Sequence, residues 1–97
     1  METKNAIIIS AEIYIEDHGI LTATVRLDYG SIVQGFGGYN LDMDGEAKSF
    51  IRGCLKAAGV DKWSELKGKT IRVRATPSHV LAIGHIIKDE WFSMGGG

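Results

Sequence analysis

The sequence contains one proline and one cysteine in 97 residues, and it has no long apolar run. A lone cysteine, Cys54, cannot form a disulfide within the chain, and this usage is typical of the reducing cytosol. No apolar stretch approaches the roughly 18–20 residues that a membrane-spanning helix needs. The N-terminus also lacks a basic segment followed by a long apolar stretch, so no secretory signal is expected. These absences predict a cytoplasmic protein with no membrane partner.

The overall composition is ordinary except for its glycine. Apolar residues make up 44% and charged residues 24%, which excludes a disordered acidic or basic tail, a collagen-like repeat and a mucin-like stalk. Thirteen residues are glycine, almost twice the usual share of about 7%. We expect residues 1–94 to form a single α+β domain and residues 95–97 to form a flexible glycine tail.

The net charge of −1 conceals two unlike halves. Residues 1–46 hold two basic and eight acidic residues, a net charge of −6, whereas residues 47–97 hold nine basic and four acidic residues, a net charge of +5. Such a chain either presents an acidic and a basic surface, or pairs the two sets of charges across the fold.

Residues 6–16 and 20–29 each alternate between two faces with a period of two, which predicts a β-hairpin turning at residues 17–19. A three-residue loop pairs Ile15 with Leu21 and continues in register to Ile9 opposite Leu27. The inward face is then formed by Ile7, Ile9, Ala11, Ile13 and Ile15. On the outward face we expect exposed apolar side chains at Ile8, Tyr14 and Ile20.

The remaining elements are expected in the order strand, helix, strand, strand. A short strand covers residues 32–36, and an apolar stripe at i, i+3, i+4, i+7, i+8 and i+11 predicts a helix over 47–58, capped by Asp44 or Asp42 and ended by Gly59. Residues 61–66 predict a short helical turn. Strands follow at 69–75 and 79–87, with Val73 opposite Ala82, and Trp91 and the next residue pack at a sheet edge. The expected fold is therefore α+β, an antiparallel sheet of about five strands with one main helix packed on it, in the order β-β-β-α-β-β.

Histidine, cysteine and carboxylate groups show no catalytic arrangement. The histidines lack a helical i, i+4 pair, and His79 and His85 lie about 20 Å apart along an extended strand. Cys54 lies on the apolar stripe of the expected helix, which favours a core position over a nucleophile. Helix capping explains Asp42 and Asp44. We therefore expect no enzyme, no metal site and no cofactor.

The most unusual local sequence lies just before the expected helix. It consists of Gln34, Gly35, Phe36, Gly37, Gly38, Tyr39 and Asn40. Backbone amides there, with the helix N-terminus, are candidates for holding an anionic ligand, and Phe36 or Tyr39 for stacking on a base. The segment has neither the dinucleotide-binding spacing nor the lysine of a P-loop. The alternative is a glycine-rich bulge where two backbones approach closely.

Basic residues gather in the second half of the chain. Lys48, Arg52 and Lys56 recur every four residues and form one row on the expected helix, and Arg72 and Arg74 share the outer face of a later strand. A joined patch predicts binding of nucleic acid, of a nucleotide or of an acidic protein. The alternative is an ordinary solvated surface, because no aromatic ribonucleoprotein motif, recognition helix or strongly basic pI accompanies the row.

Several motifs together resemble a family of short proteins encoded by bacteriophages and prophages, whose function is unassigned. The matching segments are Glu16–Thr22, Leu27–Gly30, Gln34–Tyr39, Phe50–Arg52, Gly59–Trp63, Leu66–Lys69, Ile83–Ile86 and Trp91–Phe92. The resemblance spans most of the chain and implies an accessory protein in the cytoplasm of a bacterial host cell. We therefore expect a non-catalytic protein that binds a host or phage protein or associates with itself as a dimer. The alternative is a phosphate-bearing ligand or nucleic acid bound by residues 34–40 and the basic helix face.

Overall fold

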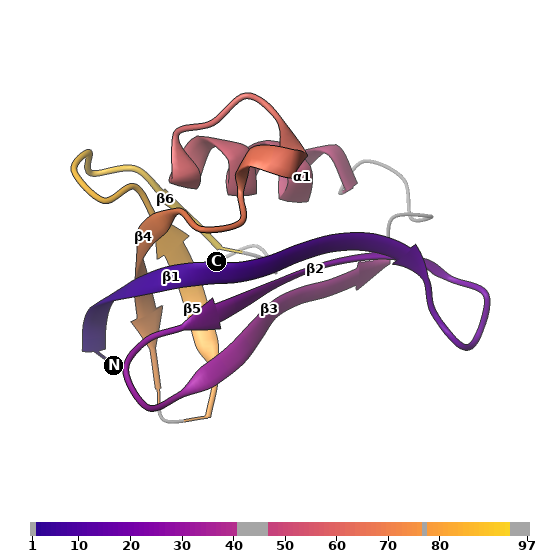
Figure 1. Ribbon diagram of the computed structural model, residues 1–97, viewed down its shortest axis with the longest axis horizontal. Helices are drawn as coiled ribbons and strands as arrows, with labels where there is room; N and C mark the ends of the chain where they lie inside the picture. The colour runs from indigo at the N-terminus through magenta and orange to yellow at the C-terminus, as the bar shows by residue number, and fades with distance from the viewer. Residues whose placement is uncertain (1, 41–46, 77, 94–97) are drawn as a thin grey trace.

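The computed structural model describes residues 2–40, 47–76 and 78–93 (Figure 1). In chain order the elements are β1 (Glu2–Ile15), β2 (Leu21–Asp28), β3 (Val33–Asn40), α1 (Ala47–Ala58), the short 3₁₀ helix η1 (Trp63–Glu65), β4 (Thr70–Ala75), β5 (Val80–Gly84) and β6 (Trp91–Phe92). The α+β class is confirmed, with one main helix over an antiparallel sheet. The expectation of about five strands in the order β-β-β-α-β-β is corrected to six strands in the order β-β-β-α-β-β-β, because Trp91 and Phe92 pair with β5 as β6.

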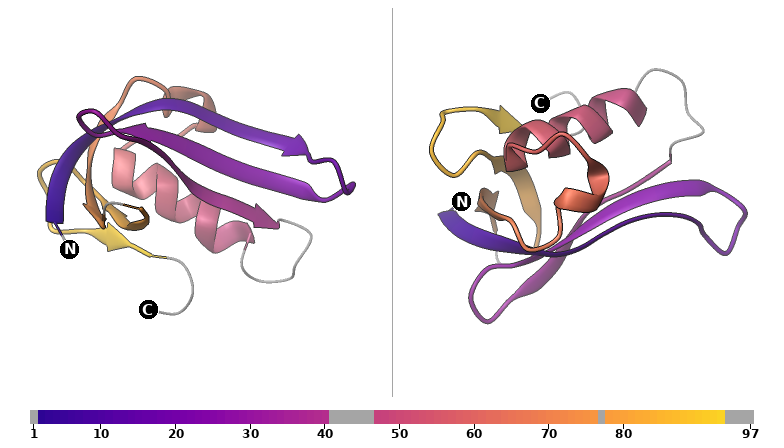
Figure 2. Two further views of the ribbon diagram at one scale, coloured as in Figure 1. Left: turned by 90° about the horizontal axis from the view of Figure 1, so that it is seen from below. Right: turned by 45° about the horizontal axis from the view of Figure 1, so that its top comes forward.

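All six strands belong to one sheet in the order β3-β2-β1-β4-β5-β6, and every neighbouring pair is antiparallel. The long N-terminal strand β1 lies at the centre because it pairs with β2 along one edge and with β4 along the other. The sheet curves around α1, which covers its concave face (Figure 2). Its curvature brings β3 towards β5, so that Gln34–Gly37 and Ser78–Leu81 line one groove. Among the described residues, no helix is long and apolar enough to cross a membrane.

The β1–β2 hairpin follows the predicted register near its turn and departs from it further along. The pairs from Ile15 with Leu21 to Ala11 with Val25 are confirmed, but a bulge between Ile8 and Ser10 places Ile8 opposite Leu27. The backbone of Ile8 is also bonded on its other side, to the Lys69 carbonyl and the Gly68 amide. Because β1 must pair along both edges, it shifts by one residue against β2.

This shift reverses the faces of the first residues of β1. Ile8, expected on the outside, is 2% exposed in the core, and Ile7, expected inside, is 48% exposed. A one-residue change of register moves side chains to the opposite face, because side chains alternate along a strand. Alternation alone cannot reveal this change, since Ile7, Ile8 and Ile9 are equally apolar.

A second bulge changes the pairing of β4 with β5. Ala75 pairs with Val80, but Val73 lies opposite Ile83 and not opposite Ala82 as predicted. The extra residue is Leu81, which is exposed, whereas Ile83 is buried in the core. The last long strand also ends at Gly84 and not at residue 87, because the residues that follow form a turn around the His85 ring.

The core is an aromatic cluster between α1 and the concave face of the sheet. Phe50 of α1 stacks on Phe36 of β3 at 6.0 Å between ring centroids, and Phe92 of β6 meets both rings edge-on. Trp63 of η1 closes the cluster at 6.4 Å from Phe50. Through Phe50, the predicted apolar stripe of α1 therefore contacts β3 and β6, two strands that are distant in sequence. The burial of this stripe supplies most of the stabilisation of the helix.

Both ends of α1 were predicted from the sequence. The helix ends at Gly59 as expected, with a positive φ of 68° and a hydrogen bond from the Val60 amide to the Leu55 carbonyl. The expected caps, Asp42 and Asp44, lie outside the described residues, as does the expected glycine tail at 95–97.

Candidate functional site

The glycine-rich segment forms the edge strand β3. All seven residues from Gln34 to Asn40 lie in it, so the segment is paired with β2 and does not form a free loop ahead of the helix. The Phe36 ring is 5% exposed and lies between Phe50 and Phe92. It is therefore unable to stack on a base without leaving the core. The side chains of Tyr39 and Asn40 lie outside the described part of the structure.

Close packing requires a glycine at position 37. Gly37 has a φ of 109°, and a Cβ there would lie 2.6 Å from Cζ of Phe50 and 3.0 Å from the carbonyl oxygen of Ala23. The register of β3 against β2 shifts at this point, between Ala23 and Thr24. This is the geometry of a glycine-rich bulge, the alternative that the sequence left open.

The first residues of β3 still border a hollow. Gln34 and Gly35 line a groove of about 400 Å³ together with Ser78, His79 and Leu81. The hydroxyl of Ser78 and Nδ1 of His79 lie 2.8 Å apart within it, and both side chains are exposed. The groove combines small polar groups without a charged cluster, which makes it a weak candidate for an anion.

The basic row of α1 faces solvent between two grooves. Lys48, Arg52 and Lys56 are exposed and line a groove of about 590 Å³ on one side of the helix. Arg52 and Lys56 also line a groove of about 440 Å³ on the other side, where Trp91 and Phe92 of β6 form the opposite wall. Within the described part of the chain, no carboxylate forms an ion pair with these three cations.

The other two basic candidates lie on the convex face of the sheet. Arg72 and Arg74 alternate with the buried residues of β4, so both point away from α1. Their guanidinium carbons lie 4.9 Å and 3.9 Å from the centroid of the Trp91 ring. The structure therefore separates these arginines from the helix row by the thickness of the sheet. The two sets approach each other at the edge strand β6, where Trp91 is common to both.

Ion pairs do not join the two halves of the chain in the described ranges. The pairs found there are Lys4 with Glu2, at 3.6 Å, and His18 with Glu16, at 3.0 Å. Both lie within residues 1–46, so neither neutralises the basic second half. This favours the first of the two arrangements expected from the sequence, an acidic and a basic surface, over pairing of the two sets of charges across the fold.

The distal part of the β1–β2 hairpin extends past α1 (Figures 1 and 2). We call residues 12–24 the hairpin arm. Ile13, Tyr14 and Ile15 are exposed by 44%, 41% and 64%. Because neighbouring side chains of a strand point to opposite faces, the arm presents apolar groups on both faces. Of the expected exposed residues, Tyr14 is confirmed, Ile20 is half-buried, and Ile8 is buried as described above.

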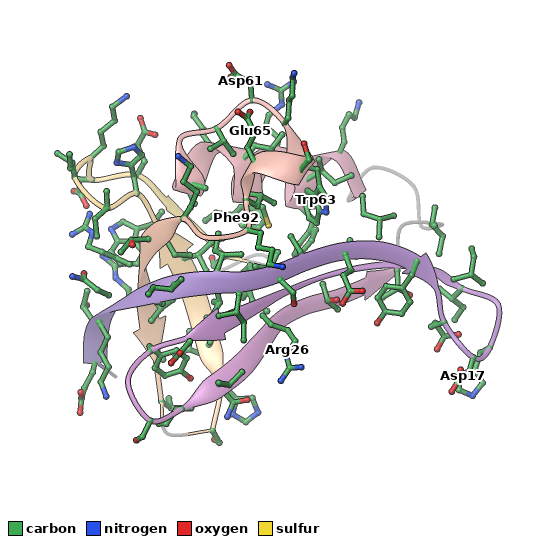
Figure 3. All side chains as sticks on the ribbon, viewed as in Figure 1. Asp17, Arg26, Asp61, Trp63, Glu65 and Phe92 are labelled. Carbon is green, nitrogen blue, oxygen red and sulfur yellow. The ribbon has the colours of Figure 1, made fainter. Side chains whose placement is uncertain are left out.

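The turn of the arm is held by one carboxylate. The carboxylate of Glu16 accepts hydrogen bonds from the backbone amides of His18 and Ile20, and its second oxygen lies 3.0 Å from Nδ1 of His18. The His18 side chain is the largest cause of a lowered pKa of Glu16, and the two amides lower it further. Gly19 has a φ of 80°, as the predicted three-residue turn requires. Asp17 points into solvent at the far end of the arm (Figure 3).

Groups that could serve in catalysis are dispersed. Burial raises the pKa of the Cys54 thiol to about 12, which agrees with its predicted core position on α1. No three His, Cys, Asp or Glu side chains gather as metal ligands in the described ranges. His18, His79 and His85 lie on three separate turns.

No protein-family model, curated protein or solved structure matches this chain. The resemblance to phage-encoded proteins therefore stays a prediction, and the function must be inferred from the surfaces themselves. Two of them stand out: the apolar, acidic hairpin arm and the basic groups around β6.

Proposed function

We propose that this protein is a non-catalytic accessory protein that acts by binding another protein, and that the hairpin arm is the contacting surface. The observation that supports this is the exposure of Ile13, Tyr14 and Ile15 on an extension of the sheet that α1 does not cover. Large apolar side chains that gather on an exposed surface are typical of a protein-binding site. If the resemblance to phage accessory proteins holds, the partner is a host protein or a phage protein. A second copy of this chain, which would give a dimer, is one such partner.

The arm also carries the chemistry that would orient a partner. Burying an exposed isoleucine contributes about 1.5–3 kcal/mol, and a tyrosine adds a large apolar area with a polar hydroxyl. Glu12, Glu16 and Asp17 surround these groups with negative charge. A partner surface with an apolar recess and a basic rim fits this combination, because complementary charge guides association and suppresses wrong partners.

The proposal is tested by site-specific crosslinking in extract of a host bacterium. A photoreactive p-benzoylphenylalanine replaces Tyr14 in one variant and Leu81 in a second, and Leu81 is a matched control because it is 44% exposed, like Ile13, but lies outside the arm. We expect one dominant adduct from position 14 that is absent from position 81. The double substitution of Ile13 and Ile15 by serine, made in the position-14 variant, should abolish it.

Sedimentation velocity on the purified chain completes the experiment. A dimer that the double serine variant dissociates identifies a second copy as the partner. Identical adducts from positions 14 and 81, or an inert monomer with no arm-dependent adduct, would contradict the proposal. Thermal melting of each variant verifies that loss of binding does not reflect loss of folding.

A further inference from the structure

The convex face of the sheet holds two fixed guanidinium groups beside an aromatic ring. Arg72 and Arg74 are two positions apart on β4, about 6.6 Å along the strand. Arg72 lies opposite Gly84 on β5, and Gly84 lies opposite Trp91 on β6. Gly84 has no side chain, so the indole ring lies across its position: a Cβ there would be 2.7 Å from Cδ2 of Trp91. The missing side chain is what lets a residue of the edge strand reach the arginines of β4.

In the described part of the chain, neither guanidinium group is paired with a carboxylate. Nε and Nη2 of Arg72 each donate a hydrogen bond of 2.8 Å, to the carbonyl oxygens of His85 and Lys88. These acceptors are neutral. The guanidinium carbon of Arg74 lies 3.9 Å from the Trp91 ring centroid, and this side chain has no hydrogen bond or ion pair in the described part of the chain. The nearby carboxylate of Asp89 accepts a hydrogen bond from the indole Nε1 of Trp91. The planar fork of Arg74 is therefore held by the ring and left free for an anion.

The same tryptophan connects this cluster to the basic row of the helix. Trp91 lines the groove of about 440 Å³ that also contains Arg52 and Lys56, and Glu90 is the one carboxylate among the described residues of its lining. Arg52 and Lys56 are one helical turn apart, about 6 Å along the axis. Cations at similar intervals thus lie on both sides of β6, a strand of two residues at the sheet edge. We call Arg52, Lys56, Arg72, Arg74 and Trp91 the β6 track.

We infer that the β6 track binds the phosphodiester backbone of a single-stranded nucleic acid that passes over the edge strand. Regularly spaced cations on an open surface suit a linear polyanion, whereas a free phosphate needs an enclosed site with several donors. Guanidinium groups bind phosphate oxygens in a bidentate manner, and the indole edge offers an apolar contact for a neighbouring base. Phe36 of the glycine-rich segment takes no part, because its ring is in the core. This site is independent of the hairpin arm, so either proposal can fail alone.

Fluorescence anisotropy tests this inference with a labelled 20-nucleotide single strand, as DNA and as RNA. The unlabelled competitors are the same sequence as a duplex, polyglutamate of equal charge, and inorganic phosphate. Arg74→Ala is compared with Arg26→Ala, which removes the same charge from an exposed arginine of β2 on the same convex face (Figure 3). Arg74→Lys keeps the charge without the fork and serves as a second variant if the alanine variant is unstable.

We expect the single strand to bind in a salt-dependent manner, with a slope of log K against log salt of about −3 for four contacted phosphates. Arg74→Ala should weaken binding about tenfold and reduce the slope by about 0.7, the value for one phosphate contact of a single strand. The affinity of Arg74→Lys should fall between those of the wild type and Arg74→Ala, and Arg26→Ala should bind like the wild type. Equal losses in both alanine variants, absence of binding, or competition by duplex, polyglutamate or phosphate as strong as that by the single strand would overturn the inference.

Discussion

Ile8 and Ile13 belong to the same strand and point to the same face of the sheet, yet they have opposite environments. Ile8 faces the α1 aromatic cluster and is 2% exposed, whereas Ile13 lies on the arm beyond the helix and is 44% exposed. The two residues are chemically identical, and each lies opposite an apolar residue of β2. An apolar pattern therefore specifies a face of a strand but does not ensure that another element covers that face. The covered part is the core, and the uncovered part is our candidate contact surface.

The largest effect is expected where the bulge places a residue in the core. Ile8→Ala should lower the free energy of unfolding by about 2–5 kcal/mol, because it leaves a cavity among well-packed side chains. Ile7→Ala is the matched control, and it should cost less than about 1 kcal/mol because that side chain is half-exposed. Urea denaturation measures both. A larger loss at position 7 than at position 8 would show that the bulge is misplaced.

A smaller loss is expected from filling the bulge in β3. Gly37→Ala should lower the free energy of unfolding by about 1–3 kcal/mol, because the new Cβ overlaps the Phe50 ring and φ is positive. Gly35→Ala is the control on the same strand, with nothing within 4 Å of its Cβ. Thermal and urea unfolding of the two variants should therefore differ clearly. Equal stabilities would mean that Phe50 does not pack on β3 as described.

On the arm, substitutions should leave stability almost unchanged. Ile15→Ser is expected to alter the free energy of unfolding by no more than about 0.5 kcal/mol, since this side chain is already 64% exposed. The same urea titration that measures Ile8→Ala provides the comparison. A loss above 1.5 kcal/mol, by contrast, would show that the arm is covered in solution, and sedimentation velocity would then reveal by what.

The smallest effect concerns the turn of the arm at low pH. The pKa of Glu16 is lowered in the folded state, so the stabilisation that its carboxylate gives the turn is fully present above the unfolded-state pKa and is lost as the pH falls through the folded-state pKa. NMR titration of the carboxyl group should give a midpoint below 4.5, and Glu16→Gln should remove the acid-induced change in amide exchange at Ile20. A midpoint at or above 4.5 would contradict the turn geometry.

The charged residues repeat the contrast between local pattern and tertiary arrangement. The basic row of α1 was predicted from its spacing, and so was the shared face of Arg72 and Arg74. The contact of Trp91 with these arginines was not predicted, because its ring reaches them only across Gly84 on an intervening strand. The signal available in the sequence was a glycine inside a strand, which often marks a close approach. A glycine at this position does not predict which side chain approaches it.

Neighbouring residues alone specify several features of this protein. The apolar stripe and Gly59 defined α1, and the turn at residues 17–19 defined the register near the tip of the hairpin, because helix ends and tight turns are governed by local backbone preferences. Contacts between distant strands, by contrast, set the bulges in β1 and β5, the burial of Ile8 rather than Ile7, and the gathering of cations around β6. Each of these features depends on strands that are far apart in the chain. The strands concerned, β1 and β5, must each pair with two neighbouring strands at once. That requirement is absent from any single stretch of sequence.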